Sequence, residues 1–184
     1  MNNDKQLFTI SVLVDNEAGV LSQVSRMFTR KGYNIESLAV GTTHDPTISR
    51  MTIELLSDRD KAELTCNQLR KLLPVHSVKL IDQANAIKRE LLLIKLATND
   101  TAERNEIVQL ANIFRASVID VSAKSITLSI IGDYDKNHAF EEMLDSFNIM
   151  ELVRTGIVAI ERGAKTITED TKEKGEFDYG KNVL

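Results

Sequence analysis

The sequence predicts an α+β protein made of two tandem βαββαβ units, each with two helices on one face of a four-stranded antiparallel sheet. Three observations support this prediction. Apolar residues switch between a period of two and a helical period along the chain. The same order of periods occurs twice. The 184 residues leave room for two units of roughly 80 residues each.

The first unit opens with a strand at residues 8–14, where apolar side chains alternate with a period of two. From Val20 the apolar residues follow helical spacing, and Gly32 is expected to end this helix. Residues 33–40 and 50–56 are expected to form the next two strands.

A second helix keeps apolar side chains at helical spacing up to Pro74, which cannot continue it. These side chains are Ala62, Cys66, Leu69 and Leu73. Residues 75–81 supply a fourth strand, so the first domain is expected to span residues 1–82.

A polar bridge at residues 82–86 precedes the repeat of this order. The expected strands are residues 90–97, 118–121, 125–131 and one within 150–160; the expected helices are residues 103–114 and the segment carrying Phe140, Met143, Leu144 and Phe147. Residues 83–163 thus form a second domain, and the pair is predicted to be two tandem ferredoxin-like domains.

Two further expectations follow from this layout. The strands are rich in Val, Ile and Leu on both sides, so we expect the helix-free sheet faces or the sheet edges to pair with other copies of the chain. The polar tail at residues 164–184 has no apolar period and is expected to be disordered.

The composition argues against several classes of protein. With 23 Lys and Arg against 27 Asp and Glu, the net charge is −4, so nothing favours nucleic acid as a partner. No apolar run approaches the ~20 residues that span a membrane, and the first residues lack the order of a signal peptide. The single cysteine suits a reducing compartment, so we expect a cytoplasmic protein without membrane partners.

The sequence contains no motif in which catalytic residue types occur at the spacing that catalysis requires. His44, His76 and His138 lie on different predicted elements, which makes them exposed structural histidines rather than ligands of a metal. Cys66 lies in an apolar helical stripe and is better explained as a small buried hydrophobe than as a nucleophile. We therefore expect no catalytic residues and no metal site.

One junction suits a ligand. Asn16-Glu17-Ala18-Gly19-Val20-Leu21 joins the first strand to the first helix. A helix start offers unpaired N–H groups to a carboxylate, Gly19 permits close approach, and Asn16 adds a donor and an acceptor. When these residues are taken alone, an ordinary helix cap is the better explanation.

The order of several such motifs is more specific. The junction is followed by Gly32-Tyr33-Asn34-Ile35-Glu36-Ser37-Leu38, then Ser49-Arg50-Met51-Thr52-Ile53, and in the second half by Arg89-Glu90-Leu91, Ile113-Phe114-Arg115-Ala116 and Arg154-Thr155-Gly156-Ile157-Val158-Ala159. From residue 8 to residue 163 the chain closely resembles the small regulatory subunit of acetohydroxyacid synthase (acetolactate synthase), whose N-terminal domain is an ACT domain.

The resemblance implies a non-catalytic protein without a cofactor of its own. Such subunits form homodimers, activate a large catalytic subunit that uses thiamine diphosphate, Mg²⁺ and FAD, and confer feedback inhibition by valine or another branched-chain amino acid. Carried over to this sequence, the effector carboxylate meets the backbone of Gly19, Val20 and Leu21, and Asn16 holds polar groups. Asn34 and Ile35 come from a strand of the neighbouring copy.

Two departures and two rival interpretations remain. Ala18 stands where the family often has proline, and the tail after Gly163 is longer than usual.

An amino-acid sensor built of tandem ACT domains that regulates another protein would share the Asn16 to Leu21 motif but not the matches around Arg115 and Arg154. An RNA-recognition module shares the βαββαβ order, but this chain is acidic and only 5% aromatic.

Overall fold

The computed structural model describes residues 5–170, which divide into two compact units. Within the described residues, the first unit consists of residues 5–36, 40–85 and 161–170, and the second consists of Ser37–Ala39 and Ala86–Ile160. The first unit therefore contains two stretches far apart in the sequence.

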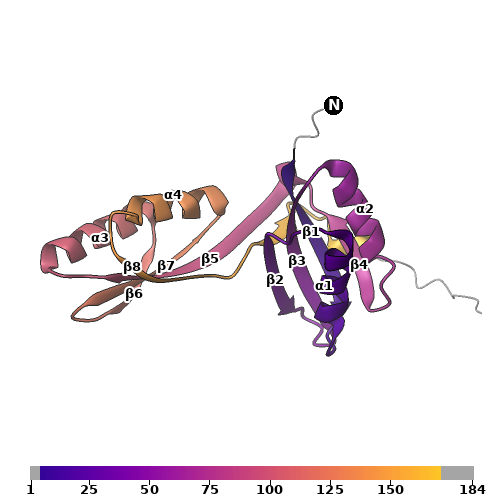
Figure 1. Cartoon of the computed structure of the whole chain (residues 1–184), viewed down its shortest axis with the longest axis horizontal. Helices are drawn as coiled ribbons and strands as arrows, with labels where there is room; N and C mark the ends of the chain where they lie inside the picture. Colours follow the sequence, from indigo (N-terminus) through magenta and orange to yellow (C-terminus); the bar gives the residue numbers. More distant parts are fainter. Residues whose placement is uncertain (1–4, 171–184) are drawn as a thin grey trace, which may run out of the picture. The chain divides into compact units, whose positions relative to one another are not determined.

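The first unit is built on a four-stranded sheet in the order β2-β3-β1-β4, with β1 antiparallel to β3 and to β4 (Figure 1). Its elements are β1 (Gln6–Asp15), α1 (Val20–Lys31), β2 (Ser37–Thr42), β3 (Ile48–Ser57), α2 (Arg59–Leu69) and β4 (Val75–Leu80). This arrangement confirms the predicted βαββαβ order and its antiparallel sheet.

Two glycines flank α1: Gly19 precedes its first residue and Gly32 follows its last. Gly32 adopts a left-handed conformation with φ 68°, and its N–H donates to the carbonyls of Phe28 and Thr29, which ends the helix as predicted. Along α1 the buried side chains are Val20, Val24, Met27 and Phe28. They pack toward the strands, whose inward residues Ile10, Val12 and Ile53 are fully buried.

Helix α2 is shorter than the sequence predicts. It ends at Leu69, and the N–H groups of Lys71 and Leu72 donate to carbonyls three residues back rather than four. This tighter turn carries Leu73 off the apolar face of the helix, so that its side chain is 98% exposed. The expectation that Leu73 continues the buried stripe is therefore wrong.

The helix-free face of the first sheet is polar and buried. Thr9, Ser11, Thr52, Glu54 and Ser77 lie on it, each at most 4% exposed. Residues 161–170, the C-terminal segment, pack there: Ser77 Oγ donates to the carbonyl of Ile167 at 2.6 Å, and Lys79 Nζ lies 2.8 Å from Glu161 Oε2. The face that the sequence leaves for a partner is thus partly covered by the chain itself.

The disorder expected from residue 164 onward does not hold for residues 164–170. The segment Ile167–Asp170 forms a 3₁₀ turn (η2), and Ile167 is only 8% exposed. The reason is tertiary, because one apolar side chain and the carbonyls beside it find partners on the sheet. The rest of the tail, residues 171–184, lies outside the described residues.

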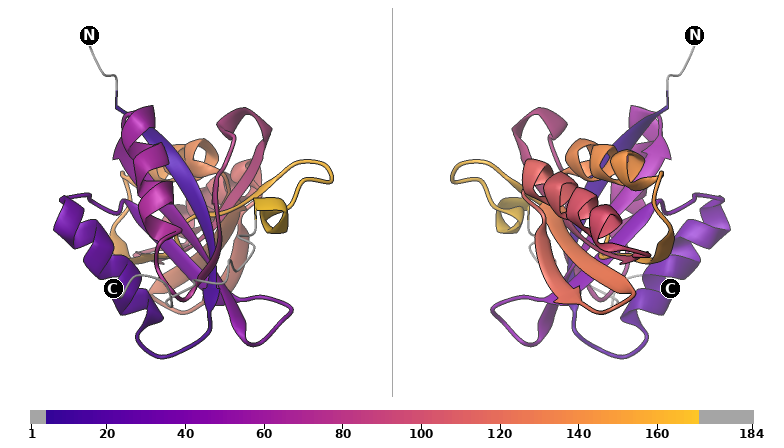
Figure 2. Two further views of the ribbon diagram at one scale, coloured as in Figure 1. Left: turned by 90° about the vertical axis from the view of Figure 1, so that its right-hand side faces the viewer. Right: turned by 90° about the vertical axis from the view of Figure 1, so that its left-hand side faces the viewer.

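The second unit repeats the order β6-β7-β5-β8, and β9 pairs with β5 as a fifth strand. Its elements are β5 (Ala86–Ala97), α3 (Thr101–Phe114), β6 (Ser117–Val121), β7 (Ser125–Gly132), α4 (Tyr134–Leu144), β8 (Ile149–Arg154) and β9 (Val158–Glu161). Helices α3 and α4 lie side by side over one face of this sheet (Figure 2). Their buried residues and the inward residues of the strands form a single apolar core.

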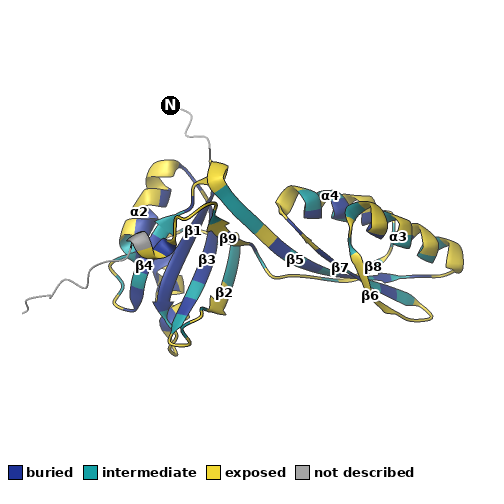
Figure 3. Ribbon diagram, turned by 180° about the vertical axis from the view of Figure 1, so that it is seen from behind, coloured by how far each residue is buried: buried dark blue, intermediate teal, exposed yellow. Residues whose placement is uncertain are grey.

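Three boundaries in the second unit differ from the prediction. Helix α4 ends at Leu144, so Phe147, which the sequence places on this helix, lies beyond it, although it still packs against the core. Strand β5 begins at Ala86, because the expected polar bridge contracts to a short 3₁₀ turn, Gln83–Asn85. The single strand expected within residues 150–160 is two strands, interrupted where Gly156 adopts φ 76°. In Figure 3 strands such as β1 and β3 carry much of the buried colour, β6 is exposed along its length, and the helices show exposed outer surfaces.

Candidate effector site

Helix α1 starts differently from the other three α-helices of the described chain. Each of α2, α3 and α4 follows an aspartate whose carboxylate accepts a hydrogen bond from the third N–H of the helix; these are Asp58, Asp100 and Asp133. At α1 the preceding residue is Gly19, with φ 89°, and no side chain caps the helix. The N–H of Val20 donates to the carbonyl of Glu17 at 3.4 Å, whereas the N–H groups of Leu21 and Ser22 are available to an external acceptor.

The space beside Gly19 is open. A Cβ atom built on this glycine has no other atom within 4 Å. Val20 is 4% exposed and belongs to the core, whereas Leu21 is 44% exposed. A ligand at this position can therefore meet the backbone of Gly19 and Val20 and the side chain of Leu21.

Asn16 is held by the loop between β2 and β3. Its Nδ2 donates to the carbonyl of Pro46 at 2.9 Å, its Oδ1 accepts from Ser49 Oγ at 3.0 Å, and its N–H donates to the carbonyl of Thr47 at 2.7 Å. Asn16 thus determines where the β1–α1 junction (residues 15–21) lies. Sequence reasoning missed Pro46 and Ser49 as its partners, because they are 30 and 33 residues away.

Asn34 and Ile35 lie in the loop before β2, not in a strand as the sequence predicts. Asn34 Nδ2 donates to Glu36 Oε1 at 2.8 Å, and the N–H of Glu36 donates to the carbonyl of Glu54. In one copy these residues follow the far end of α1, whose 12 residues make it about 18 Å long. A single chain therefore does not bring them to the junction.

A histidine that the sequence did not single out for this site lies beside the junction. His76 Nε2 is 2.6 Å from Asp15 Oδ1, with the histidine side chain 24% exposed. The sequence predicts three exposed histidines; His44 and His138 are exposed, but His76 is half-buried because it packs against the end of β1. Spacing along the chain could not reveal this pair, which joins residues 61 apart.

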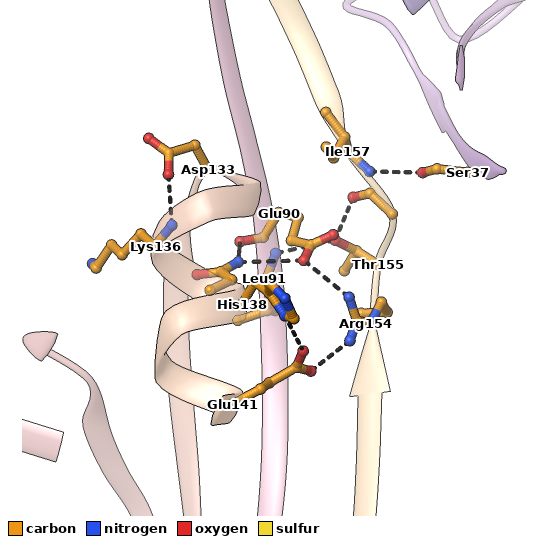
Figure 4. Close-up of polar contacts among 12 residues, drawn as sticks. Ser37, Glu90, Leu91, Asp133, Lys136, His138, Glu141, Arg154, Thr155 and Ile157 are labelled. Carbon is orange, nitrogen blue, oxygen red and sulfur yellow. Dashed lines mark hydrogen bonds and ion pairs between the residues drawn. The ribbon is translucent and has the colours of Figure 1, made fainter. Parts of the chain in front are cut away.

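A second polar cluster lies in the second unit (Figure 4). Glu90, only 5% exposed, accepts from Asn137 Nδ2 at 3.4 Å and lies 3.6 Å from Arg154 Nη1, while Arg154 Nη2 donates to Glu141. Thr155 Oγ1 accepts from the N–H of Leu91 at 3.2 Å. The buried carboxylate of Glu90 is paired with Arg154 and hydrogen-bonded to Asn137, so this cluster joins α4, β5 and β8.

Cys66 lies in the core of the first unit. Cys66 is 2% exposed, which confirms the prediction of a small buried side chain, and burial raises the pKa of its thiol to about 11. Among residues 5–170 no group of three or more His, Cys, Asp or Glu side chains is arranged to hold a metal ion. None of the helices in that part of the chain is long and apolar enough to span a membrane.

The fold and the glycine-started helix together define a protein of the ACT class. Residues 10–77 match the family described as AHAS small subunit-like ACT domain, and residues 89–163 match the family described as small subunit of acetolactate synthase. The chain belongs to the acetolactate synthase small-subunit family.

The relatives agree over most of the chain. A probable acetolactate synthase small subunit from Methanothermobacter thermautotrophicus is 43% identical over 158 residues, covering 86% of this chain and 94% of its own. The acetolactate synthase small subunit of Aquifex aeolicus is 42% identical over 164 residues, which cover 89% of this chain and 85% of that protein. The crystal structure of the small subunit from Thermotoga maritima has a TM-score of 0.82 at 36% identity, covering 87% of this chain and 99% of that one.

Proposed function

We propose that this chain is the non-catalytic regulatory subunit of acetohydroxyacid synthase, which raises the activity of the catalytic large subunit and confers feedback inhibition by valine or another branched-chain amino acid. Thiamine diphosphate, Mg²⁺ and FAD belong to that partner, and the complex works in the cytoplasm. The observation that supports a small anionic effector is the start of α1, where Gly19 replaces the aspartate cap of the other helices.

The effector site is completed by a second copy of the chain. Strand β2 lies at an edge of the first sheet, with Val40 48% exposed, so it can pair with β2 of another copy. In an antiparallel pair, the start of one β2 lies beside the end of the other. Asn34 and Ile35 precede the start of β2, and the loop that holds Asn16 follows its end, so this pairing brings both halves of the proposed site together.

Such a split site provides a mechanism for regulation. A ligand that bridges two copies stabilises the dimer arrangement for which it has the higher affinity, and the large subunit responds to that arrangement. A coupling free energy of about 1–3 kcal/mol changes affinity by a factor of about 5–150. Valine needs only a small apolar pocket beside its carboxylate site, and one methylene more or less changes binding by about 1–3 kcal/mol.

Reconstitution tests this proposal. The purified chain is mixed with a large subunit in the presence of thiamine diphosphate, Mg²⁺ and FAD, and acetolactate formation is measured with valine, leucine or isoleucine. We expect the chain to raise the rate, at least one amino acid to lower it again, and the chain alone to show no turnover. Turnover by the chain alone, or failure to co-elute with and activate the large subunit, contradicts the proposal.

A matched pair of substitutions tests the site itself. Gly19→Asp places a carboxylate at the helix start, where it repels the carboxylate of the effector, so feedback inhibition is lost while activation remains. Gly19→Asn is the control, because aspartate and asparagine tolerate the left-handed backbone of Gly19 similarly and differ in charge. Inhibition of the Gly19→Asp complex equal to that of the Gly19→Asn complex rejects the carboxylate site.

A further inference from the structure

A β-bulge directs His76 toward the β1–α1 junction. Leu13 pairs with Ser77 and Val14 pairs with Val75, so His76 is the extra residue of β4 at this point. A bulge redirects the side chain of the extra residue. In this case it brings His76 Nε2 to 2.6 Å from Asp15 Oδ1.

Asp15 is tied to the start of β4 twice. Besides its contact with His76, its N–H donates to the carbonyl of Pro74 at 2.9 Å. Asp15 is followed directly by Asn16, whose own hydrogen bonds reach the β2–β3 loop. The junction is thus held from β4 on one side and from the β2–β3 loop on the other. Among these residues His76 is the histidine, the type of side chain whose charge changes nearest to neutral pH.

The charged groups around His76 come from two elements. Asp15 ends β1, and Asp45 lies in the β2–β3 loop. The pKa of the Asp45 carboxyl lies below its ordinary value, mainly because the side chain and the N–H of Thr47 donate to it, with smaller contributions from His44 and His76. A protonated His76 therefore interacts directly with the carboxylate of Asp15 and more weakly with that of Asp45, with which His44 also interacts.

We propose that His76 is a positioning residue of the effector site and that its protonation strengthens binding of the amino-acid effector. A charge-assisted hydrogen bond is roughly twice as strong as a neutral one, so protonation holds the junction more firmly in the arrangement that exposes the start of α1. The added positive charge also favours a carboxylate there. This inference rests on the proposed function and adds to it a dependence on pH.

The test is calorimetric titration of the full-length chain with valine, leucine and isoleucine at pH 6 and pH 8. The carboxylate and ammonium groups of these ligands keep their charges over this range, so a change in affinity reports on the protein. We expect the effector to bind about threefold to tenfold more tightly at pH 6, as the difference between charged and neutral hydrogen bonds suggests.

Three variants isolate the source of the pH dependence. His76→Gln keeps a donor that does not titrate, and Asp15→Asn keeps the hydrogen bond without the negative charge; both are expected to bind with nearly equal affinity at the two pH values. His138→Gln, an exposed histidine of the second unit, is the control and is expected to keep the wild-type ratio. His44→Gln is expected to keep most of it.

The outcomes separate this inference from the proposed function. Equal affinity of the wild-type chain at pH 6 and pH 8, or an unchanged ratio in His76→Gln and Asp15→Asn, overturns the role of His76 and leaves feedback inhibition intact. If only His44→Gln loses the difference in affinity between pH 6 and pH 8, the pH dependence comes from His44, and the inference about His76 is also overturned. A chain that binds none of the three amino acids and gives no inhibition of the complex overturns both.

Discussion

At the scale of single residues, a glycine and a buried amide determine how β7 meets α4. A Cβ atom on Gly132 would lie 2.4 Å from Asn137 Oδ1 and 2.9 Å from Lys136 Cδ. Asn137 is 1% exposed, and its Nδ2 donates to the carbonyl of Glu90 at 3.3 Å. The amide therefore cannot move away from a new methyl group without losing its hydrogen bond to β5.

We expect Gly132→Ala to lower the free energy of unfolding of the second unit by about 1–3 kcal/mol, the usual cost of overpacking. Hydrogen exchange of the amides in β7 and α4 measures this unit separately from the first. Gly41→Ala is the control, because a Cβ atom at that strand position has no neighbour within 4 Å. Equal protection of the two variants would show that Asn137 adjusts without cost.

At the scale of elements, the C-terminal segment acts as part of the first unit. Lys79 of β4 is 14% exposed and Glu161 is 8% exposed, and the N–H of Arg162 donates to the carbonyl of Asn85 at 2.8 Å. The pKa of the Glu161 carboxyl lies below its ordinary value, chiefly because Lys79 donates a hydrogen bond to it. Ionised Glu161 therefore stabilises this packing.

The sign of the pH dependence follows from that lowered pKa. The stabilisation by Glu161 is fully present above the ordinary pKa of a glutamate, near 4.5, and is lost as the pH falls through the lower value of the folded chain. We expect Glu161→Gln to reduce the free energy of unfolding of the first unit by about 1–2 kcal/mol at pH 7. The variant should also lose less of its free energy of unfolding than the wild-type chain when the pH is lowered.

Urea unfolding at pH 7 and pH 4, followed by hydrogen exchange in β4, tests this expectation. Glu151→Gln is the matched control, since Glu151 lies 2.9 Å from Lys95 but the two side chains are 61% and 41% exposed. An exposed ion pair contributes little to the free energy of unfolding. Equal effects of the two substitutions would mean that Glu161 is no more than a surface charge.

At the scale of the whole molecule, the proposed effector site requires two copies. The Asn16 to Leu21 half lies at one end of α1 and Asn34 and Ile35 follow the other end, so one chain cannot bring them around an amino acid. Units of about 80 residues also gain from association, because small domains bury a smaller share of their surface.

Mixed dimers test the split site. Gly19→Asp impairs one half of the site and Asn34→Asp impairs the other, so neither variant alone is expected to bind the effector. When the two are unfolded together and refolded as a mixture, each mixed dimer contains one intact site, and calorimetric binding should return. The control is a mixture of Gly19→Asp and Asn16→Ala, which both impair the same half of the site, so this mixture should not bind the effector. Binding by the control mixture, or no binding by the first mixture, argues for a site within one chain.

Much of the fold could be predicted because its signals are local. The apolar periods at α1, β1 and β3 report the burial of one face of each element, and Gly19 and Gly32 mark the ends of α1 through their backbone conformation. The motif from Asn16 to Leu21 could be proposed as a ligand site for the same reason, since a helix start carries its N–H groups wherever it lies in the fold.

Other features could not be predicted, because they depend on contacts between distant residues. Leu73 leaves its helix where the chain turns early toward β4, and Ile167 is buried on the first sheet although its own segment has no apolar period. The partners of Asn16 and the approach of His76 to Asp15 join loops that only the sheet register brings together.

Residues that are adjacent or regularly spaced along the chain were enough to predict the repeated βαββαβ order, the glycine at the start of α1 and the resemblance to a known family. The folded chain was needed to show that residues 161–170 belong to the first unit, that a bulge in β4 presents His76, and that the two halves of the proposed site lie at opposite ends of α1. Strand pairing and packing between remote segments decide these points, and periodicity carries no information about them.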